Sequence, residues 1–355
     1  MVIAELAVPV VAAPMAGGPS TAELVAAVGE AGGLGFLAGG YLSPETLARQ
    51  IADVWDASTR PFGVNLFVPD ASNTYLNGRP RGLSGQDRVQ AVAAYRDALA
   101  GEAARRGVEL PQPGVGEPDD WERQLDLVVR ERVPVVSFTF GLPGAAVFSE
   151  LSRAGIETMV TVTDYDEATA AIAAGADALC LQGPDAGGHR GTLDPVKRPS
   201  GRHLADLVAE VRPLTQLPLI AAGGIATPGA AAALVDAGAD AVQLGTAFLL
   251  TPEAGTSLAH RRAFADPALT TTTVTRAFSG RWARALTTDF VLQHGPAAPA
   301  AYPEVHHMTV PLRRAAAAAD EPALLALWAG TGWRDATAVP AATVVAHFAR
   351  SLARH

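Results

Sequence analysis

The chain has few of the residues on which several common kinds of site depend. Its 355 residues include a single cysteine, Cys180, which excludes an internal disulfide and any cysteine-ligated zinc or iron–sulfur site. Lys197 is the only lysine and stands in a loop beside Arg198 and Pro199, an unfavourable place for a Schiff-base or general-base lysine. Aromatic residues make up only 6%, so we expect a core built from Ala, Val and Leu.

Positive charge is also scarce. A formal net charge of −9 argues against nucleic acid or an anionic membrane as the main partner. No apolar run is long enough to span a bilayer, and the first residues lack the features of a signal peptide. We therefore expect a soluble, cytoplasmic protein, and its oligomeric state stays open. Any phosphate must be bound locally by backbone amides, because no basic surface is available.

One sequence module recurs along the chain: an Ala-rich helix, a glycine and a short apolar strand. Its clearest copies are residues 174–181 and 237–244. Glycine after the last helical residue adopts the left-handed conformation that ends a helix. Near-continuous apolar strands are typical of a parallel sheet covered on both faces.

Eight candidate strands match the strand count of a (β/α)₈ barrel. A doubly wound sheet would normally carry a glycine-rich fingerprint after its first strand, but here Pro14 interrupts that position. We therefore predict an α/β fold, a (β/α)₈ TIM barrel. The candidate strands are Val8–Ala12, Leu34–Leu37, Phe62–Leu66, Val135–Thr139, Thr158–Val162, Ala178–Leu181, Leu219–Ala222 and Ala241–Leu244.

Two regions exceed a minimal barrel. Residues of about 70–132 follow the third strand as an insertion with helical segments at Gln86–Arg106 and Asp119–Arg132. The prediction is a barrel domain over residues 1–265, and a C-terminal lid and helical tail over residues 266–355 that packs on the barrel mouth. The tail is Ala-rich from Leu312 to His355.

Glycines follow the seventh and eighth strands, at Gly223-Gly224 and Gly245-Thr246. Loops at these places in a barrel commonly bind phosphate through backbone amides and a helix N-terminus, and Thr227-Pro228 is a plausible helix start. The alternative is that the glycines only turn tight corners. If a phosphate binds here, valine at Gly224 should collide with it.

Small residues and amides follow strands on the opposite side of the mouth. Pro14, Met15 and Ala16 expose main chain, while Asn65 and Gln182 can each donate and accept hydrogen bonds. This mixture suits the edge of a flavin ring, although each amide alone is as readily a turn cap. Together with a phosphate site opposite, the pattern predicts bound flavin mononucleotide (FMN).

The loop from Gln182 to Gly191 contains one histidine, His189, directly after Gly187 and Gly188. Its imidazole titrates near pH ~6.5 when unperturbed, so it suits a general base. The adjacent pair His306 and His307 resembles a metal site. On an extended chain, however, adjacent side chains point to opposite faces, so we expect no metal there. We expect His306 to contact the substrate instead. Ser279 and Arg281 are further substrate-side candidates, although Arg281 is equally explained as a solvated side chain.

These motifs together resemble the nitronate monooxygenase family, once called 2-nitropropane dioxygenases. The similar segments cover nearly the whole chain, and the histidine-containing loop is the most specific of them. They are residues 13–18, 63–67, 182–191, 221–225, 243–246, 279–281 and the region of Tyr302-Pro303.

The resemblance implies a barrel enzyme that binds FMN noncovalently and uses dioxygen to oxidise alkyl nitronates, or nitroalkanes, to a carbonyl compound and nitrite. It implies that His189 is the base that removes the α-proton of a neutral nitroalkane. Two alternatives stay open: an NAD(P)H-dependent flavin reductase of an enoyl thioester or a quinone, and a flavin-binding barrel without turnover. The implied cofactor-binding residues are Pro14, Met15, Ala16, Asn65, Gln182, Gly187, Gly188, Gly223, Gly224, Gln243, Gly245 and Thr246.

Three positions depart from the family pattern. Asp185 replaces the more usual glutamate, Trp282 stands where proline commonly follows the Ser-Gly-Arg element, and His306 replaces a polar amide. All three lie on the expected substrate side, so the resemblance specifies the cofactor better than the natural substrate.

Overall fold

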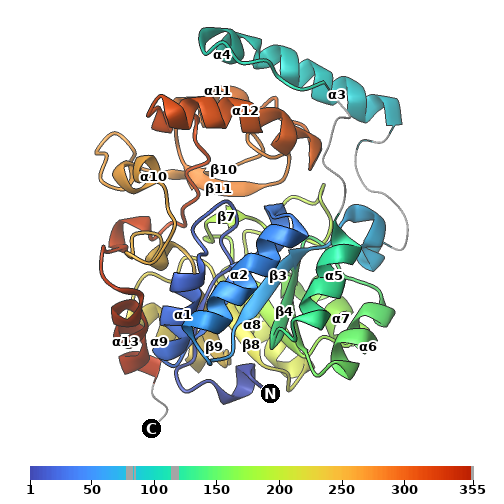
Figure 1. Ribbon diagram of the computed structural model, residues 1–355, viewed down its shortest axis with the longest axis vertical. Helices are drawn as coiled ribbons and strands as arrows, with labels where there is room; N and C mark the ends of the chain where they lie inside the picture. Colours follow the sequence, from blue (N-terminus) through green and yellow to red (C-terminus); the bar gives the residue numbers. More distant parts are fainter. Residues whose placement is uncertain (77–82, 84, 113–119, 353–355) are drawn as a thin grey trace.

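The computed structural model describes residues 1–76, 83, 85–112 and 120–352. Eight parallel strands form a closed barrel surrounded by helices, which confirms the predicted (β/α)₈ fold (Figure 1). The first and last barrel strands pair directly, with Val11 opposite Gln243. The barrel strands are β1 Val10–Ala12, β2 Leu34–Ala38, β3 Gly63–Phe67, β4 Val135–Thr139, β5 Glu157–Val162, β6 Ala178–Gln182, β8 Leu219–Ala222 and β9 Ala241–Leu244.

Local signals fix the ends of the surrounding helices. In α9 the Thr227 side chain accepts from the Ala230 N–H, and Pro228 opens the helix, as the sequence predicts. α7 ends at Gly175, whose φ of 95° is the left-handed cap expected of the repeated module. The helices between barrel strands are α1 Ala22–Glu30, α2 Pro44–Ala57, α5 Trp121–Arg130, α6 Ala145–Arg153, α7 Tyr165–Ala174, α8 Leu204–Val211 and α9 Pro228–Asp236.

The end of the chain supplies the eighth helix of the ring. α13 (Ala341–Leu352) packs against α9 and α1, the helices on either side of the closing strand pair. Its buried residues recur at helical spacing, and they include Val344, Val345 and Phe348. The predicted boundary at residue 265 therefore separates α13 from the barrel ring that it completes.

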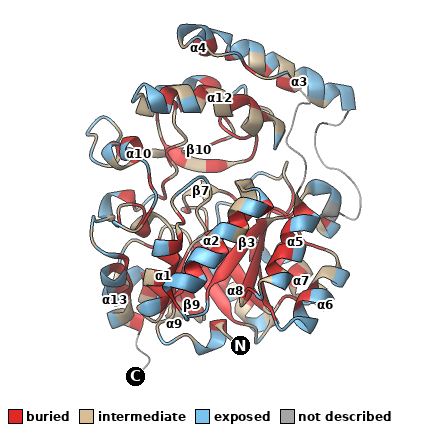
Figure 2. Ribbon diagram, viewed as in Figure 1, coloured by how far each residue is buried: buried red, intermediate tan, exposed pale blue. Residues whose placement is uncertain are grey.

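Side chains fill the barrel interior, so the barrel is a packed core. Figure 2 shows buried residues along the strands and exposed residues on the outer faces of the helices. Ile3 and its neighbours pack under the N-terminal ends of the strands. The interior is thereby filled at the N-terminal end of the strands. The interior cluster is Val11, Leu34, Phe36, Val135, Met159, Ala178, Cys180, Ile220, Ala222 and Ala241.

A cover lies over this C-terminal end. It contains an antiparallel sheet of β10 (Thr272–Thr275), β11 (Ala283–Leu286) and β7 (Gly188–His189), in the order β10-β11-β7. Three helices accompany the sheet: α10 (Leu258–Ala263), α11 (Asp289–His294) and α12 (Glu304–Ala318). Short 3₁₀ helices occur at Ile3–Glu5, Gly39–Tyr41, Asp70–Ser72, Thr74–Leu76, Arg212–Leu214, Thr246–Phe248, Pro322–Leu324 and Trp333–Asp335.

The insertion after β3 joins this cover. The helix predicted over 86–106 is two helices, α3 (Gly85–Ala98) and α4 (Ala100–Arg105), at the top of Figure 1. Tyr95 on α3 is buried, and its hydroxyl donates to the Ala277 carbonyl at 2.7 Å.

The second predicted helix of the insertion packs elsewhere. α5 contacts α2 and β3, so it belongs to the barrel ring, and the predicted start at Asp119 lies outside the described residues. Within the described part of the chain, no helix has the length and hydropathy needed to cross a membrane.

Candidate active site

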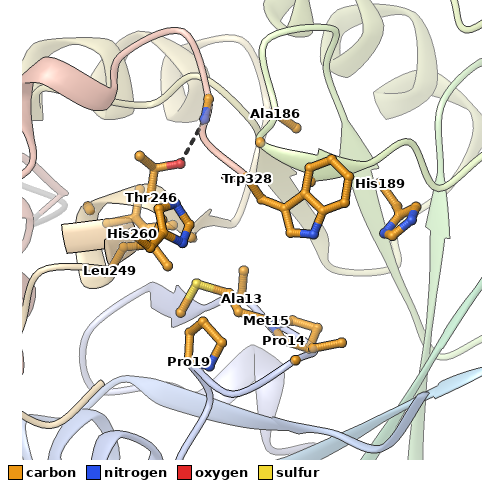
Figure 3. A pocket seen from close by; sticks show the side chains of 18 of the residues that line it. Ala13, Pro14, Met15, Pro19, Ala186, His189, Thr246, Leu249, His260 and Trp328 are labelled. Carbon is orange, nitrogen blue, oxygen red and sulfur yellow. Dashed lines mark hydrogen bonds between the residues drawn. The ribbon is translucent and has the colours of Figure 1, made fainter. Parts of the chain in front are cut away.

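A cavity of about 840 Å³ lies between the C-terminal strand ends and the cover. Figure 3 shows Thr246 and His260 toward one side of it and His189 toward the other, with Trp328 between them. The predicted residues that line the cavity are Pro14, Met15, Ala16, Asn65, Gln182, Gly187, Gly188, His189, Gly223, Gly224, Gln243, Gly245, Thr246, Ser279 and His306.

His189 is held in place by a strand pairing. It lies in β7 opposite Ala283 of β11, and its Nε2 is 2.8 Å from the Ser279 hydroxyl oxygen. The ring is half-buried. Burial, with the positive charges of Arg281 and Arg313, lowers the pKa of His189 to about 3. The imidazole is therefore neutral at physiological pH and can accept a proton.

Aromatic rings surround this imidazole. The ring centroids of Trp328 and Phe140 lie 5.2 Å and 5.5 Å from that of His189, and Tyr302 lies at 6.4 Å. Phe140 has a φ of 78°, which is costly for a residue with a side chain and directs its ring to this place. The ring cluster therefore gives His189 a largely apolar setting.

Arg281 does not line the cavity, although the sequence suggests a substrate contact or a solvated side chain. It is buried, and its guanidinium lies 4.2 Å above the Phe140 ring. One Nη donates to the Thr192 carbonyl, and the other donates to the Phe140 carbonyl and the Asp70 carboxylate. Arg281 therefore joins the loops around His189 and supports the ring cluster.

The glycine pair after β8 is needed by the protein itself. Gly223 and Gly224 have φ values of 110° and 71°, in the left-handed region that favours glycine. A Cβ on Gly224 would lie 2.4 Å from the Cβ of Asp185. Valine at Gly224 would thus strain the chain and clash with Asp185 even without a ligand, and the expected collision with a bound phosphate stays a prediction. The tight turn brings main-chain N–H groups to the cavity.

The turn after β9 leaves more room. A Cβ on Gly245 would meet only Ala13 and Met15, at the ordinary contact distances of 3.5 Å and 3.9 Å. Thr246 begins a 3₁₀ helix, and its hydroxyl accepts from the Gly330 N–H at 3.0 Å. The C-terminal segment around Gly330 therefore closes over this end of the cavity.

The three amide side chains of the cavity differ in how many of their polar atoms have hydrogen-bond partners. Gln182 bonds the loop at both ends, donating to the His189 carbonyl at 3.0 Å and accepting from the Gly191 N–H at 2.8 Å. Asn65 donates from Nδ2 to the Ser137 and Thr139 hydroxyls. The Nε2 of Gln243 lies 3.3 Å from the Sγ of Cys180. The buried Oε1 of Gln243 has no hydrogen-bond partner among the described residues.

These features fit a flavin. The unpartnered Oε1 of Gln243 faces the lining of a cavity where an N–H or a polar ring edge would satisfy it. Main-chain N–H groups at the glycine turns suit an anionic phosphate, as does the N-terminus of α9. A cavity of about 840 Å³ accommodates such a cofactor together with a small substrate.

His306 lies on a helix and not on an extended chain, so the expected extended geometry was wrong. It is the third residue of α12, and its ring stacks on Tyr41 with a centroid distance of 4.2 Å. Arg313, two turns along α12, donates to His306 Nδ1 at 3.3 Å. Because a guanidinium only donates, Nδ1 accepts and His306 is neutral. Burial and then Arg313 lower the pKa of His306 to about 2.

Sequence reasoning missed several residues of the lining. Trp328, His260, Tyr41 and Arg313 come from segments whose place over the mouth no local motif indicates. For Arg313 the spacing from His306 is a signal, because residues seven apart lie on one face of a helix such as α12.

Comparisons with known proteins agree with this geometry. Residues 2–350 match the family described as nitronate monooxygenase. A probable nitronate monooxygenase of Staphylococcus aureus strain MSSA476 is 34% identical over 343 residues, which cover 96% of this chain and 92% of that protein.

Solved structures extend the comparison. A nitroalkane oxidase from Streptomyces ansochromogenes superposes with a TM-score of 0.90 and 46% identity, covering 99% of this chain and 98% of that one. FabK from Thermotoga maritima has a TM-score of 0.73 at 24% identity, over 99% of this chain and 94% of that chain, which shows a shared fold alone. Enzymes of the matching family are in general flavin-dependent oxidoreductases that act on nitronates or nitroalkanes. With both its fold and its sequence matched over nearly the whole length, this chain belongs to the nitronate monooxygenase family.

Proposed function

We propose that the protein binds FMN and oxidises alkyl nitronates with dioxygen to a carbonyl compound and nitrite. The observation that carries the proposal is the position of His189, a neutral imidazole in the lining of the same cavity as the glycine turns. The substrates are accordingly a small nitro compound and dioxygen.

FMN would be held by the chain at two places. The phosphate would accept from main-chain N–H groups at Gly223–Gly224 and Gly245–Thr246, near the N-terminus of α9. The ring would lie against Pro14, Met15 and Ala16, where Gln243 Oε1 can accept from it. When bound, the flavin supplies the redox chemistry by taking electrons from the substrate and passing them to dioxygen.

His189 would act before the redox step. In a neutral nitroalkane the proton on the carbon beside the nitro group moves to a ring nitrogen of His189, and the electron pair of the broken C–H bond remains on the substrate as the nitronate. Ser279 fixes the ring orientation through its contact with Nε2. A nitronate added as such already lacks that proton and needs no base.

Oxygen uptake and nitrite release with a panel of nitronates and neutral nitroalkanes test the proposal. His189→Asn should lower kcat/KM for neutral nitroalkanes by about 10²- to 10⁴-fold and largely spare nitronates. His203→Asn, at an exposed histidine outside the cavity, is the matched control. Equal losses on both substrates would exclude proton abstraction by His189. Rapid anaerobic bleaching of the flavin by NAD(P)H, without nitronate turnover, would identify a reductase instead.

A further inference from the structure

The cavity continues along one face of α12. His306, Val310, Arg313, Arg314 and Ala317 all line it, at the spacing that places residues on one side of a helix. At 1.5 Å per residue this face is about 16 Å long. The cavity wall beside His189 is therefore continued by a helix face that carries positive charge.

Arg313 is the charged group on the inner part of this face. Its Nε lies 3.3 Å from the Thr309 hydroxyl, and its Nη2 lies 3.3 Å from both the carbonyl oxygen and Nδ1 of His306. These hydrogen bonds are long, and all go to neutral groups of the same helix. The Nη1 group has no acceptor among the described residues, although it belongs to a side chain of the cavity lining.

Two other arginines near the cover have carboxylate partners. Arg281 pairs with Asp70 at 3.3 Å, and Arg88 pairs with Glu304 at 2.6 Å. Among the described residues, no carboxylate forms an ion pair with Arg313. A largely buried cation without a counter-ion is costly, and an anionic ligand would remove that cost.

We propose that Arg313 is the counter-ion of the substrate's nitronate group, so that the site selects nitronate anions over neutral nitroalkanes of the same carbon skeleton. The inference rests on the proposed function. A nitronate group is planar and carries its negative charge on two oxygens, which matches the fork of N–H donors on a guanidinium. Tyr41, whose ring stacks on His306, completes the wall beside this cation.

The electrostatics of the cavity agree with this assignment. The positive charge of Arg313 contributes to the lowered pKa of both His189 and His306, after the larger effect of burial. Its charge therefore reaches both imidazoles. An anion bound at Arg313 would neutralise it.

Nitrate is a suitable probe, because it is a planar anion that resembles the nitronate group and cannot be oxidised. Calorimetric titration of nitrate into the purified protein measures binding without turnover. Arg313→Met should weaken nitrate binding and raise KM for a nitronate by roughly 10- to 100-fold, with little change in KM for the neutral nitroalkane. Arg153→Met, which removes an exposed charge on α6 outside the cavity, should change either constant by less than about twofold.

The outcomes separate the two proposals. Two results would overturn the role of Arg313 while nitronate oxidation stands. One is that nitrate binds Arg313→Met as tightly as it binds the wild type. The other is that nitrate fails to compete with a nitronate in the wild type. If no nitronate is oxidised, the proposed function fails, but the nitrate titration still tests Arg313. Should Arg313→Met not fold, as judged by circular dichroism, Arg313→Lys and Arg313→Gln replace it. Lysine should restore nitrate binding and glutamine should not; equal binding by both would refute the inference.

Discussion

The pH dependence of neutral nitroalkane oxidation follows from the setting of His189. The base must be neutral to accept a proton, and burial among aromatic rings together with two arginine charges lowers its pKa to about 3. An imidazole with an ordinary pKa of ~6.5 would be only about 3% neutral at pH 5. With a pKa of about 3, about 99% of His189 is neutral at that pH.

We therefore expect kcat/KM for a neutral nitroalkane to change less than about twofold between pH 8 and pH 5, where an ordinary histidine would lose about 30-fold. Initial rates of oxygen uptake, started from freshly dissolved neutral nitroethane, measure this. The nitronate of the same compound is the control for pH effects on later steps. An acidic limb with a midpoint near pH ~6.5, present for the nitroalkane and absent for the nitronate, would refute the desolvated setting of His189.

Three further predictions concern the cofactor turns and stability. Gly245→Ala should fold normally but weaken FMN binding by at least about tenfold. Gly224→Ala should also lower the melting temperature, because the φ of 71° at Gly224 and the contact with Asp185 strain the chain. FMN titration and thermal melts distinguish the two variants, and wild-type FMN affinity in Gly245→Ala would contradict the proposed phosphate contact. Burial lowers the pKa of His260 to about 4. The contribution of its neutral ring to the free energy of unfolding is therefore fully present above the unfolded pKa of ~6.5 and is lost as the pH falls toward 4. Urea unfolding should show a loss of about 2 kcal/mol from this group between pH 7.5 and pH 5, which His260→Gln should abolish. Tyr95→Phe leaves a buried Ala277 carbonyl without its donor, and unchanged unfolding would contradict the expected cost of about 1–2 kcal/mol.

The barrel could be predicted from the sequence because its signals are local. Five of the barrel strands follow a helix and a residue with positive φ, which ends that helix. The predicted strands agree with the observed ones to within two residues at each end. The glycine turns were found because they follow strands directly, and His189 because its loop begins where β6 ends. Their convergence on one cavity follows from the closed parallel barrel, which brings all strand ends to one mouth.

The last helix of the barrel ring and the residues that the cover brings to the site depend on long-range packing. Nothing local indicates that α13 completes the barrel ring more than ninety residues after β9, or that Trp328 reaches His189. The chemistry of Arg281 is equally ambiguous in sequence, because the same guanidinium can bind a ligand or bind the carbonyls of neighbouring loops. Its contacts with Thr192 and Phe140 appear only once the cover is folded over the barrel.

The proposed function requires one cofactor to span this cavity, with its phosphate at the two glycine turns and its ring beside His189. A crystal structure of the protein with bound FMN tests it most directly. We expect phosphate oxygens within hydrogen-bonding distance of main-chain N–H groups at Gly224 and Thr246, and the flavin ring between the β1 turn and His189. A phosphate bound elsewhere, or a ring that leaves His189 out of reach of a substrate on its face, would contradict it.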